Sequence, residues 1–189
     1  CIADPLRPEA ASVLHQLHKL GIRNTVMMTG DSYRTAEAIA KQVGVDQFYA
    51  EVLPEDKANF VQKEKAAGHT VVMIGDGIND SPALSAADIG IAINSGAAIA
   101  REIADVTIKA DSLEELVFLK TVANALQHRV SANYRFVLSF NSTLILLGAL
   151  GILQPAASAM LHNLSTLGIS LKSMTNLVQT PSSVPQIAK

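Results

Sequence analysis

The sequence predicts an α/β domain built on a parallel sheet, followed by a helical hairpin that crosses a membrane. Over about the first 110 residues, short apolar runs alternate with amphipathic helical stretches, which is typical of a parallel sheet covered by helices. Residues 136–171 contain no Asp, Glu, Lys or Arg. Hydrophobic residues make up 49% of the 189-residue chain, charged residues 17%, and the mean hydropathy is +0.26. These values exclude an intrinsically disordered chain and fit a folded domain joined to an apolar segment.

Proline and glycine set the limits of the elements expected in the α/β part. Pro8 and Pro54 lie near the starts of two helical stretches, and Gly21, Gly44 and Gly68 each follow the end of one. We therefore expect helices and short buried strands in alternation. The helices are expected at residues 8–20, 34–43, 54–67 and about 97–104, and the strands at residues 24–28, 48–52, 71–74, 89–93 and 106–108.

The charge-free stretch has the length and composition of two membrane helices. Residues 136–153 are mostly apolar and about as long as a bilayer-spanning helix, which needs roughly 20 residues. Gln154 and Pro155 then predict a turn, and a second, more polar stretch follows. We expect a membrane region at residues 128–178, with helices at about 134–153 and 156–174, and a loose tail at 179–189.

Basic residues flank this pair of helices and predict its orientation. Arg129 and Arg135 precede it and Lys172 follows it, which places both ends, and the α/β domain, in the cytoplasm. The second stretch carries several hydroxyl and amide side chains. A buried hairpin of a soluble protein is therefore the alternative interpretation.

Cysteine usage and charge exclude several kinds of partner. The single cysteine, Cys1, excludes an internal disulfide and an all-cysteine metal cage. A pI near 6.2 and a net charge of -2 argue against a nucleic-acid partner. The chain starts with Cys1 rather than Met and has no signal-peptide pattern, so we expect it to begin within a longer protein.

A turn with two carboxylates follows the clearest buried strand. Residues 75–80 read Gly-Asp-Gly-Ile-Asn-Asp and come directly after the strand expected at 71–74. Ligands bind at the carboxyl ends of parallel strands, and hard oxygen donors at this spacing suit Mg²⁺ shared with a phosphate. An Asp-Gly hairpin turn is the alternative, but the residues that follow have a helical pattern.

Two further elements could contribute to the same phosphate site. Thr29, Gly30 and Asp31 follow the strand expected at 24–28, where the threonine hydroxyl and the glycine N–H can donate to phosphate oxygens. Lys57 lies near the start of a helix and could offset phosphate charge. A plain helix N-cap at Asp31 and a solvated lysine are the alternatives.

Four segments in this order resemble the C-terminal part of a P-type cation-transporting ATPase of the heavy-metal (type IB) subfamily. They are Asp-Pro-Leu-Arg at residues 4–7, Thr-Gly-Asp at 29–31, Pro-Glu-Asp-Lys at 54–57 and Gly-Asp-Gly-Ile-Asn-Asp-Ser-Pro-Ala-Leu at 75–84. The resemblance implies a haloacid-dehalogenase-like (Rossmann-type) phosphorylation domain over residues 1–127. It also implies that the hairpin is the last pair of membrane helices, because other subfamilies carry more helices there.

The resemblance assigns a role to each residue of these motifs, with Mg²⁺ as cofactor and ATP as substrate. It implies that Asp76 ligates Mg²⁺ and that Asp80 orients Lys57 from the edge of the Mg²⁺ shell. The residues implied to hold the phosphoryl group are Thr29, Gly30, Lys57 and Asn79, and those implied to border the nucleotide are Asp4, Arg7 and Asp31.

The chain departs from the family at the nucleophile. It contains no Asp-Lys-Thr-Gly-Thr segment, whose aspartate is phosphorylated in the family, so we expect the chain alone not to turn over ATP. The missing N-terminal part of the same pump is then an expected partner. A haloacid-dehalogenase-type phosphatase and a noncatalytic half of a split pump are the alternatives. The phosphatase would need an Asp-x-Asp nucleophile, which Asp4-Pro5 does not provide.

Polar residues in the second apolar stretch predict a site for the transported ion. His162, Ser165 and Thr166 share one helical face by their i, i+3 and i+4 spacing, and Asn141 lies in the preceding stretch. An ionisable residue in a membrane helix suggests a functional site, and imidazole suits transition metals. The alternative is a histidine that only hydrogen-bonds Asn141. Within the subfamily, this pattern resembles that of members that handle manganese, iron or cobalt, with zinc or cadmium next.

Overall fold

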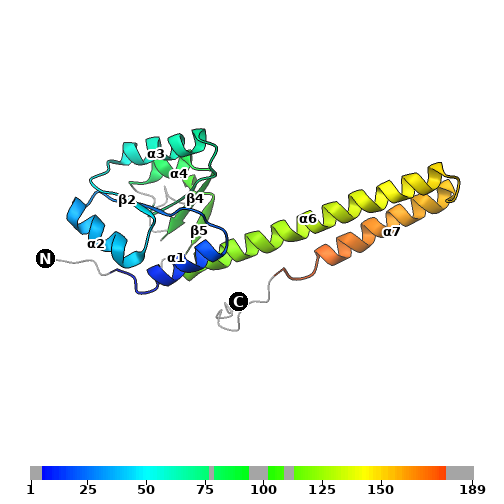
Figure 1. The fold of residues 1–189 in the computed structure, drawn as a ribbon, viewed down its shortest axis with the longest axis horizontal. Coiled ribbons are helices and arrows are strands. Elements are labelled where there is room, and N and C mark those ends of the chain that lie inside the picture. The colour runs from blue at the N-terminus through cyan, green and yellow to red at the C-terminus, as the bar shows by residue number, and fades with distance from the viewer. Residues whose placement is uncertain (1–5, 77–78, 94–101, 109–112, 178–189) are drawn as a thin grey trace. The chain divides into compact units, whose positions relative to one another are not determined.

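The computed structural model describes residues 6–76, 79–93, 102–108 and 113–177. The chain divides into two compact units, residues 1–120 and 121–189 (Figure 1). The expected nucleotide-bordering Asp4, most of the helix expected at 97–104, and the expected loose tail at 179–189 lie outside the described residues.

Five short parallel strands form two sheets in the first unit. Strand β1 (Val26–Met28) pairs with β2 (Gln47–Tyr49), and β3 (Val72–Gly75), β4 (Ile89–Ile93) and β5 (Val106–Ile108) form the second sheet in that order. The predicted parallel arrangement is confirmed, as are the predicted bounds of β4 and β5. Among the described residues, β1 and β3 are not hydrogen-bonded to each other.

The second expected strand was placed too far along the chain. We expected it at 48–52, but β2 ends at Tyr49 because the backbone then turns toward β1: the Val52 N–H donates to the Thr29 carbonyl at 3.0 Å. Glu51 has a φ of 57°, a left-handed conformation that ends the strand. The first expected strand is also shorter than predicted, because the Thr25 N–H is bonded to the Asp46 carboxylate at 2.7 Å.

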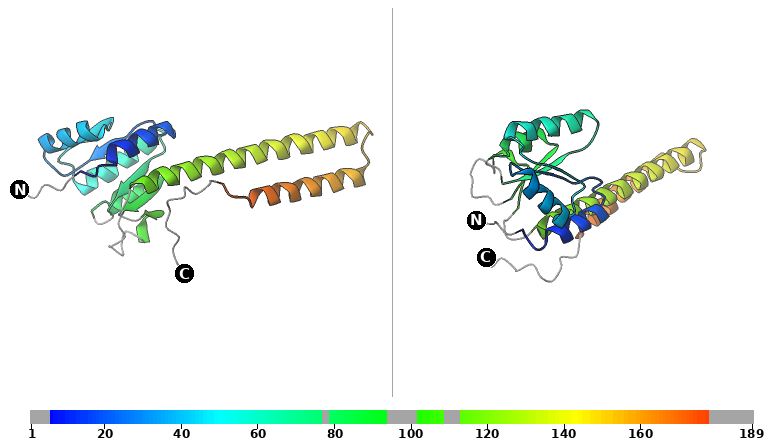
Figure 2. Two further views of the ribbon diagram at one scale, coloured as in Figure 1. Left: turned by 90° about the horizontal axis from the view of Figure 1, so that it is seen from below. Right: turned by 60° about the vertical axis from the view of Figure 1, so that its left-hand side comes forward.

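Helices flank the strands on both sides, as Figures 1 and 2 show. Helices α1 (Ala10–Lys19) and α2 (Tyr33–Val43) contact each other, and α3 (Pro54–Ala66) packs on α4 (Ser81–Ala86). The helices expected at 8–20, 34–43 and 54–67 are confirmed to within about two residues at each end. Gly44 follows α2 with a φ of 81°, the left-handed conformation that glycine adopts at helix ends.

Two apolar clusters hold this unit together. Val61 of α3, Met73 of β3 and Ala83 and Leu84 of α4 are buried against one another, and Met28 at the end of β1 packs on this cluster. Ile91, Ile108 and Leu116 form the second cluster. Full burial of a side chain such as Leu84 contributes about 2 kcal/mol. The first cluster therefore fixes α3 and α4 against β3, directly behind the predicted phosphate site.

The second unit contains the expected pair of helices with different limits. Helix α6 (Glu114–Ala149) begins in the first unit, some 20 residues before the predicted start at 134, and ends before the predicted residue 153 because Gly151 turns the chain with a φ of 73°. Pro155 starts α7 (Pro155–Ser173), where its lack of an N–H costs nothing. No helix in the described ranges is both long and apolar enough to cross a membrane, so the predicted membrane spans are not confirmed.

Candidate phosphate site and hairpin site

The turn after β1 is organised by its own side chains. The Thr29 hydroxyl donates to Asp31 Oδ2 at 2.9 Å, and the Asp31 N–H donates to Thr29 Oγ1 at 3.1 Å. The Glu51 N–H donates to the Asp31 carbonyl at 2.9 Å, which ties this turn to the one after β2. Gly30 and Asp31 are exposed, so the turn presents a glycine N–H and a carboxylate at the surface.

Helix α3 begins beside this turn. The bond from Val52 to Thr29 brings the chain back to the end of β1, and Pro54 then starts the helix. Asp56 accepts a hydrogen bond from the Leu53 N–H at 3.3 Å and so caps the first turn. Lys57 follows on that first turn. The two loops therefore deliver a threonine, a glycine and a lysine to one end of the strands.

Lys57 reaches the loop after β3. Its Nζ lies 2.7 Å from Asp80 Oδ1, and the two side chains are only 15% and 13% exposed. Asp80 is the residue before α4, whose buried Ala83 and Leu84 pack against α3. The ion pair thus joins two helices that the apolar cluster already holds together.

Gly75 leaves room for the Asp80 carboxylate. A Cβ at Gly75 would lie 2.5 Å from Asp80 Oδ2, closer than any side chain tolerates. The first glycine of the motif is therefore needed for the close approach of an aspartate rather than for a left-handed backbone. Asp76 and Asn79 are exposed at the same end of β3, and residues 77 and 78 between them are not described.

Of the four polar residues expected at the ion site, His162 and Asn141 meet between α6 and α7, whereas Ser165 and Thr166 bond to the backbone of α7. His162 Nδ1 lies 2.9 Å from Asn141 Oδ1, and the hydroxyls of Ser165 and Thr166 donate to the His162 carbonyl at 2.7 and 3.1 Å. The His162–Asn141 contact is the one that the alternative interpretation predicts. A cavity of about 580 Å³ also has these two residues in its lining.

The comparisons with known proteins agree with the motifs. Residues 1–88 match the haloacid dehalogenase-like hydrolase family. The chain is 41% identical over 169 residues to a zinc-exporting P-type ATPase of Mycobacterium marinum and to a manganese-exporting P-type ATPase of Mycobacterium leprae, covering 89% of this chain and 23% of each relative. A crystal structure of a zinc-transporting PIB-type ATPase in the E2.Pi state matches with a TM-score of 0.79 and 34% identity, over 90% of this chain and 28% of that one.

The chain matches a fragment of a type IB P-type ATPase. This confirms the family expected from the ordered motifs. The chain spans about a quarter of the length of the curated relatives it matches. A copper-transporting ATPase of Arabidopsis thaliana, RAN1, is also similar, with 44% identity over 140 residues. The metals in these names differ, so similarity alone does not choose among them.

The donor set at the turn after β3 fits Mg²⁺ bound together with a phosphate. Asp76 is exposed at the end of β3, while one Asp80 oxygen is already bonded to Lys57. In the part of the chain that the structure describes, no three His, Cys, Asp or Glu residues are grouped to hold a metal ion. Mg²⁺ is usually bound by one or two carboxylates, and water and phosphate oxygens complete its coordination shell.

Two residues before α1, Asp4 and Arg7, were expected to border the nucleotide, and the structure describes only Arg7. Its guanidinium lies 3.9 Å from a carboxylate oxygen of Glu9, two residues further along the chain. This weak local ion pair neither supports nor opposes the expected role at the nucleotide. Asp4, its expected companion, lies outside the described residues.

Two structural carboxylates, Asp46 and Asp88, were not predicted from the sequence. Asp46 accepts from the Thr25 hydroxyl and N–H, both at 2.7 Å, and these bonds lower its pKa. The Val71 N–H donates to Asp88 at 2.8 Å; this bond, together with Lys65, lowers the Asp88 pKa. Each aspartate lies just before a strand and ties it to the start of the neighbouring strand. Both aspartates precede an apolar run, and this position is the feature of the sequence that could have identified them.

Proposed function

We propose that this chain forms the C-terminal part of the phosphorylation domain and the following helical hairpin of an ATP-driven exporter of a transition-metal cation. In the full-length protein, ATP hydrolysis would proceed through an aspartyl phosphate and drive metal translocation. The observation that carries the proposal is the Lys57–Asp80 pair, which is held by α3 and α4 at the ends of the strands. The four ordered motifs and the type IB relatives support it.

The residues of this chain would hold the phosphoryl group rather than accept it. The Lys57 ammonium would neutralise charge on the phosphoryl oxygens, and Asp80 would keep that ammonium in place. The Thr29 hydroxyl, the Gly30 N–H and the Asn79 amide would donate to the same oxygens. Asp76 would hold Mg²⁺, which supplies further charge neutralisation when bound.

Three acidic or basic residues would border the nucleotide. Asp31 already accepts from Thr29 and so could link the phosphate turn to the nucleotide. We assign the same neighbourhood to Arg7 and Asp4 on the strength of the Asp-Pro-Leu-Arg motif. ATP is then the substrate of the full-length protein and makes contact with only part of this chain.

The phosphorylated aspartate would come from the N-terminal part of the same pump. Among the described residues, β1 and β3 belong to separate sheets, and each precedes a turn of the phosphate site. We place between them a parallel strand that carries the nucleophile, which would join the two sheets. Without that strand, the 189-residue chain is expected to hydrolyse no ATP.

The hairpin would contact membrane lipid and the transported ion. Large apolar side chains such as Ile145 and Ile152 are 73% and 69% exposed, which favours an apolar surrounding or further helices as their cover. Arg129, Arg135 and Lys172 would then lie at the cytoplasmic surface, on the same side as the phosphorylation domain.

We assign ion binding to the side chains around His162. When Nδ1 carries the proton, it donates to Asn141 Oδ1 and leaves the Nε2 lone pair free for a metal. Ser165 and Thr166 supply oxygens on the same face. Imidazole with oxygen donors favours a divalent ion, manganese, iron or cobalt first and zinc or cadmium next, over Cu⁺, which prefers thiolate and thioether ligands.

Metal-stimulated ATP hydrolysis by the intact protein, reconstituted in lipid, tests the proposal. Mn²⁺, Fe²⁺, Co²⁺, Zn²⁺, Cd²⁺ and Cu⁺ are compared, with Asp76→Asn as the inactive control. Stimulation of ATP hydrolysis by one set of divalent ions supports the proposal of an exporter and identifies the transported ion. Stimulation by Cu⁺ alone would overturn the assignment of a divalent ion. No stimulation by any metal, or phosphate release by the isolated chain, would overturn the exporter itself.

A further inference from the structure

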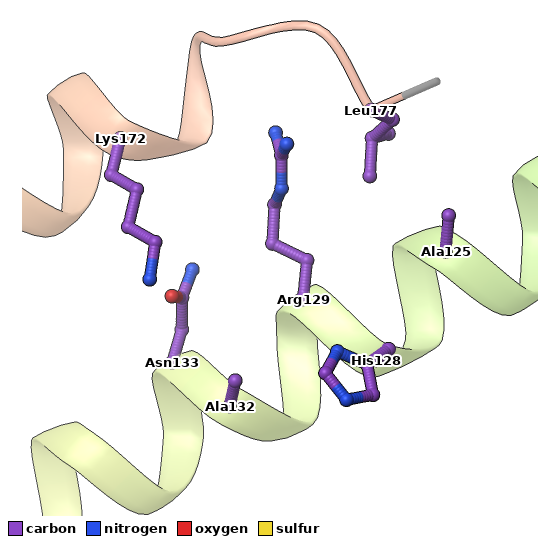
Figure 3. A pocket seen from close by; sticks show the side chains of 7 residues that line it. All are labelled: Ala125, His128, Arg129, Ala132, Asn133, Lys172 and Leu177. Atoms are coloured by element: carbon purple, nitrogen blue, oxygen red, sulfur yellow. The ribbon is translucent and has the colours of Figure 1, made fainter. Parts of the chain in front are cut away.

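A second cavity lies at the other end of the hairpin, between α6 and the end of α7. It has a volume of about 360 Å³, and its polar lining consists of His128, Arg129, Asn133 and Lys172. Figure 3 shows Arg129 and Lys172 extending toward each other's helix, with Lys172 pointing toward Asn133. The remaining lining is apolar, from Ala125, Ala132 and Leu177. The cavity therefore combines a cationic part with an apolar part.

Arg129 is fixed in place by the end of α7. Its Nη1 donates to the carbonyls of Ser173 and Thr175 at 3.3 and 2.6 Å, and its Nη2 donates to that of Asn176 at 3.0 Å. These bonds satisfy the Ser173 carbonyl, which the end of α7 leaves without a helical partner, and two carbonyls of the residues that follow the helix. A guanidinium has five N–H donors, so the hydrogen bonds found among the described residues leave two available. The positive charge is thus held rigidly at the cavity.

No carboxylate of the hairpin balances this charge. From residue 116 to the end of the chain the sequence contains no Asp or Glu, whereas Arg129, Arg135 and Lys172 are all cationic. Asn133 Nδ2 donates to Ser173 Oγ at 3.1 Å, and Lys172 points toward this neutral amide (Figure 3). A polar cavity with two cations and no carboxylate of its own is suited to an anionic ligand.

We propose that this cavity binds the phosphate group of an anionic membrane phospholipid. The inference rests on the proposed function, because it requires the hairpin to lie in a membrane. Lys172 and the available donors of Arg129 would contact the phosphate oxygens. Ala125, Ala132 and Leu177 would contact the glycerol and the first methylenes, which an inorganic phosphate does not have. A basic pocket between helices at the cytoplasmic surface is a common form of lipid headgroup site.

Native mass spectrometry of the intact protein, released from detergent, measures the binding. Phosphatidylglycerol is titrated against phosphatidylcholine with the unaltered protein, Lys172→Gln and the matched control Arg135→Gln. Arg135 belongs to the same hairpin and carries the same charge, but it does not line the cavity. Lys172→Gln should lower the affinity for phosphatidylglycerol about fivefold, whereas Arg135→Gln should change it less than twofold. Lys172→Arg should keep most of the affinity and so exclude misfolding as the cause.

Each other result contradicts the inference in a distinct way. Equal losses in Lys172→Gln and Arg135→Gln would mean diffuse attraction to the membrane surface. Full displacement of the lipid by inorganic phosphate would mean that the cavity binds free phosphate. Absence of lipid preference while metal-stimulated ATP hydrolysis persists would overturn this inference alone. Failure of the intact protein to associate with membranes would overturn the proposed function as well.

Discussion

Lys57 Nζ lies 2.7 Å from Asp80 Oδ1, and the two residues are 23 positions apart in the chain. Both side chains are largely buried, at 15% and 13% exposed, and the contact joins the first turn of α3 to the residue before α4. A charge in such a place is costly unless it is paired. The two residues are therefore expected to depend on each other.

Removing one partner of this pair should destabilise the first unit. In Lys57→Met the Asp80 carboxylate would remain mostly buried without its cation, at a cost of about 3 kcal/mol in the free energy of unfolding. Urea denaturation followed by circular dichroism measures the change. Lys41→Met is the matched control, because it breaks the 2.8 Å pair with Glu37, in which Lys41 is 75% exposed. Equal effects in both variants would contradict a special role for the buried pair.

A methyl group at Gly75 should displace Asp80. The Cβ of Gly75→Ala would lie 2.5 Å from Asp80 Oδ2, so the carboxylate must move away from Lys57 or the loop must shift. We expect lower stability by about 1–3 kcal/mol and loss of phosphoenzyme in the intact protein. Gly30→Ala is the control for stability, since its Cβ would lie 3.8 Å from the nearest heavy atom, the Val52 carbonyl oxygen. Unchanged stability in Gly75→Ala would show that Asp80 moves freely.

Asp76→Asn should prevent phosphorylation while leaving the fold intact. Asp76 is exposed at the end of β3, so the neutral amide should change the free energy of unfolding little. The loss of one carboxylate should weaken Mg²⁺ binding and abolish the phosphoenzyme formed from ATP. Acid-stable labelling of the intact protein with radioactive ATP measures this. Normal labelling would exclude Asp76 as a Mg²⁺ ligand.

The stability of the first unit should fall in acid through Asp46 and Asp88. Hydrogen bonds from Thr25 to Asp46 and from Val71 to Asp88 hold both pKa values below the ordinary aspartate value. A lowered folded-state pKa stabilises the fold above the unfolded pKa, and this contribution is lost as the pH falls through the folded pKa. Asp46→Asn should therefore be less stable than the unaltered chain at pH 7, and the difference should disappear at low pH. Urea denaturation at several pH values measures the free energy of unfolding of both proteins. A difference in stability that stays constant with pH would contradict the contribution of the Asp46 pKa.

His162→Ala should reduce metal-stimulated turnover without changing phosphorylation in the absence of metal. The variant removes the imidazole and leaves Asn141 without the partner that now lies 2.9 Å away. Metal-stimulated ATP hydrolysis by the intact protein measures the effect across the divalent ions. Ser170→Ala, about two turns further along α7, is the control, because the hydroxyl of Ser170 donates to the Thr166 carbonyl. Equal turnover in all three proteins would leave His162 with a structural role.

The local pattern of the sequence determined most of the elements. Apolar runs were enough for the bounds of β4 and β5, and helical periodicity followed by a glycine was enough for α1, α2 and α3, because these signals act within a few residues. The predicted limits of β2 and α6 were wrong. Strand β2 ends early because the Val52 N–H bonds to the Thr29 carbonyl after the strand. Helix α6 starts earlier than predicted because it includes the polar residues before the apolar stretch, which hydropathy alone had placed outside the membrane helix.

By itself, the sequence determined the family, the order of the motifs and the residues that each turn presents, because those depend on residue type and spacing. Only the tertiary structure decided which of these residues meet. Lys57 with Asp80, His162 with Asn141, and Arg129 with the end of α7 are each contacts over 21 residues or more. Such contacts depend on how helices pack, and packing reflects the whole apolar core rather than any local pattern.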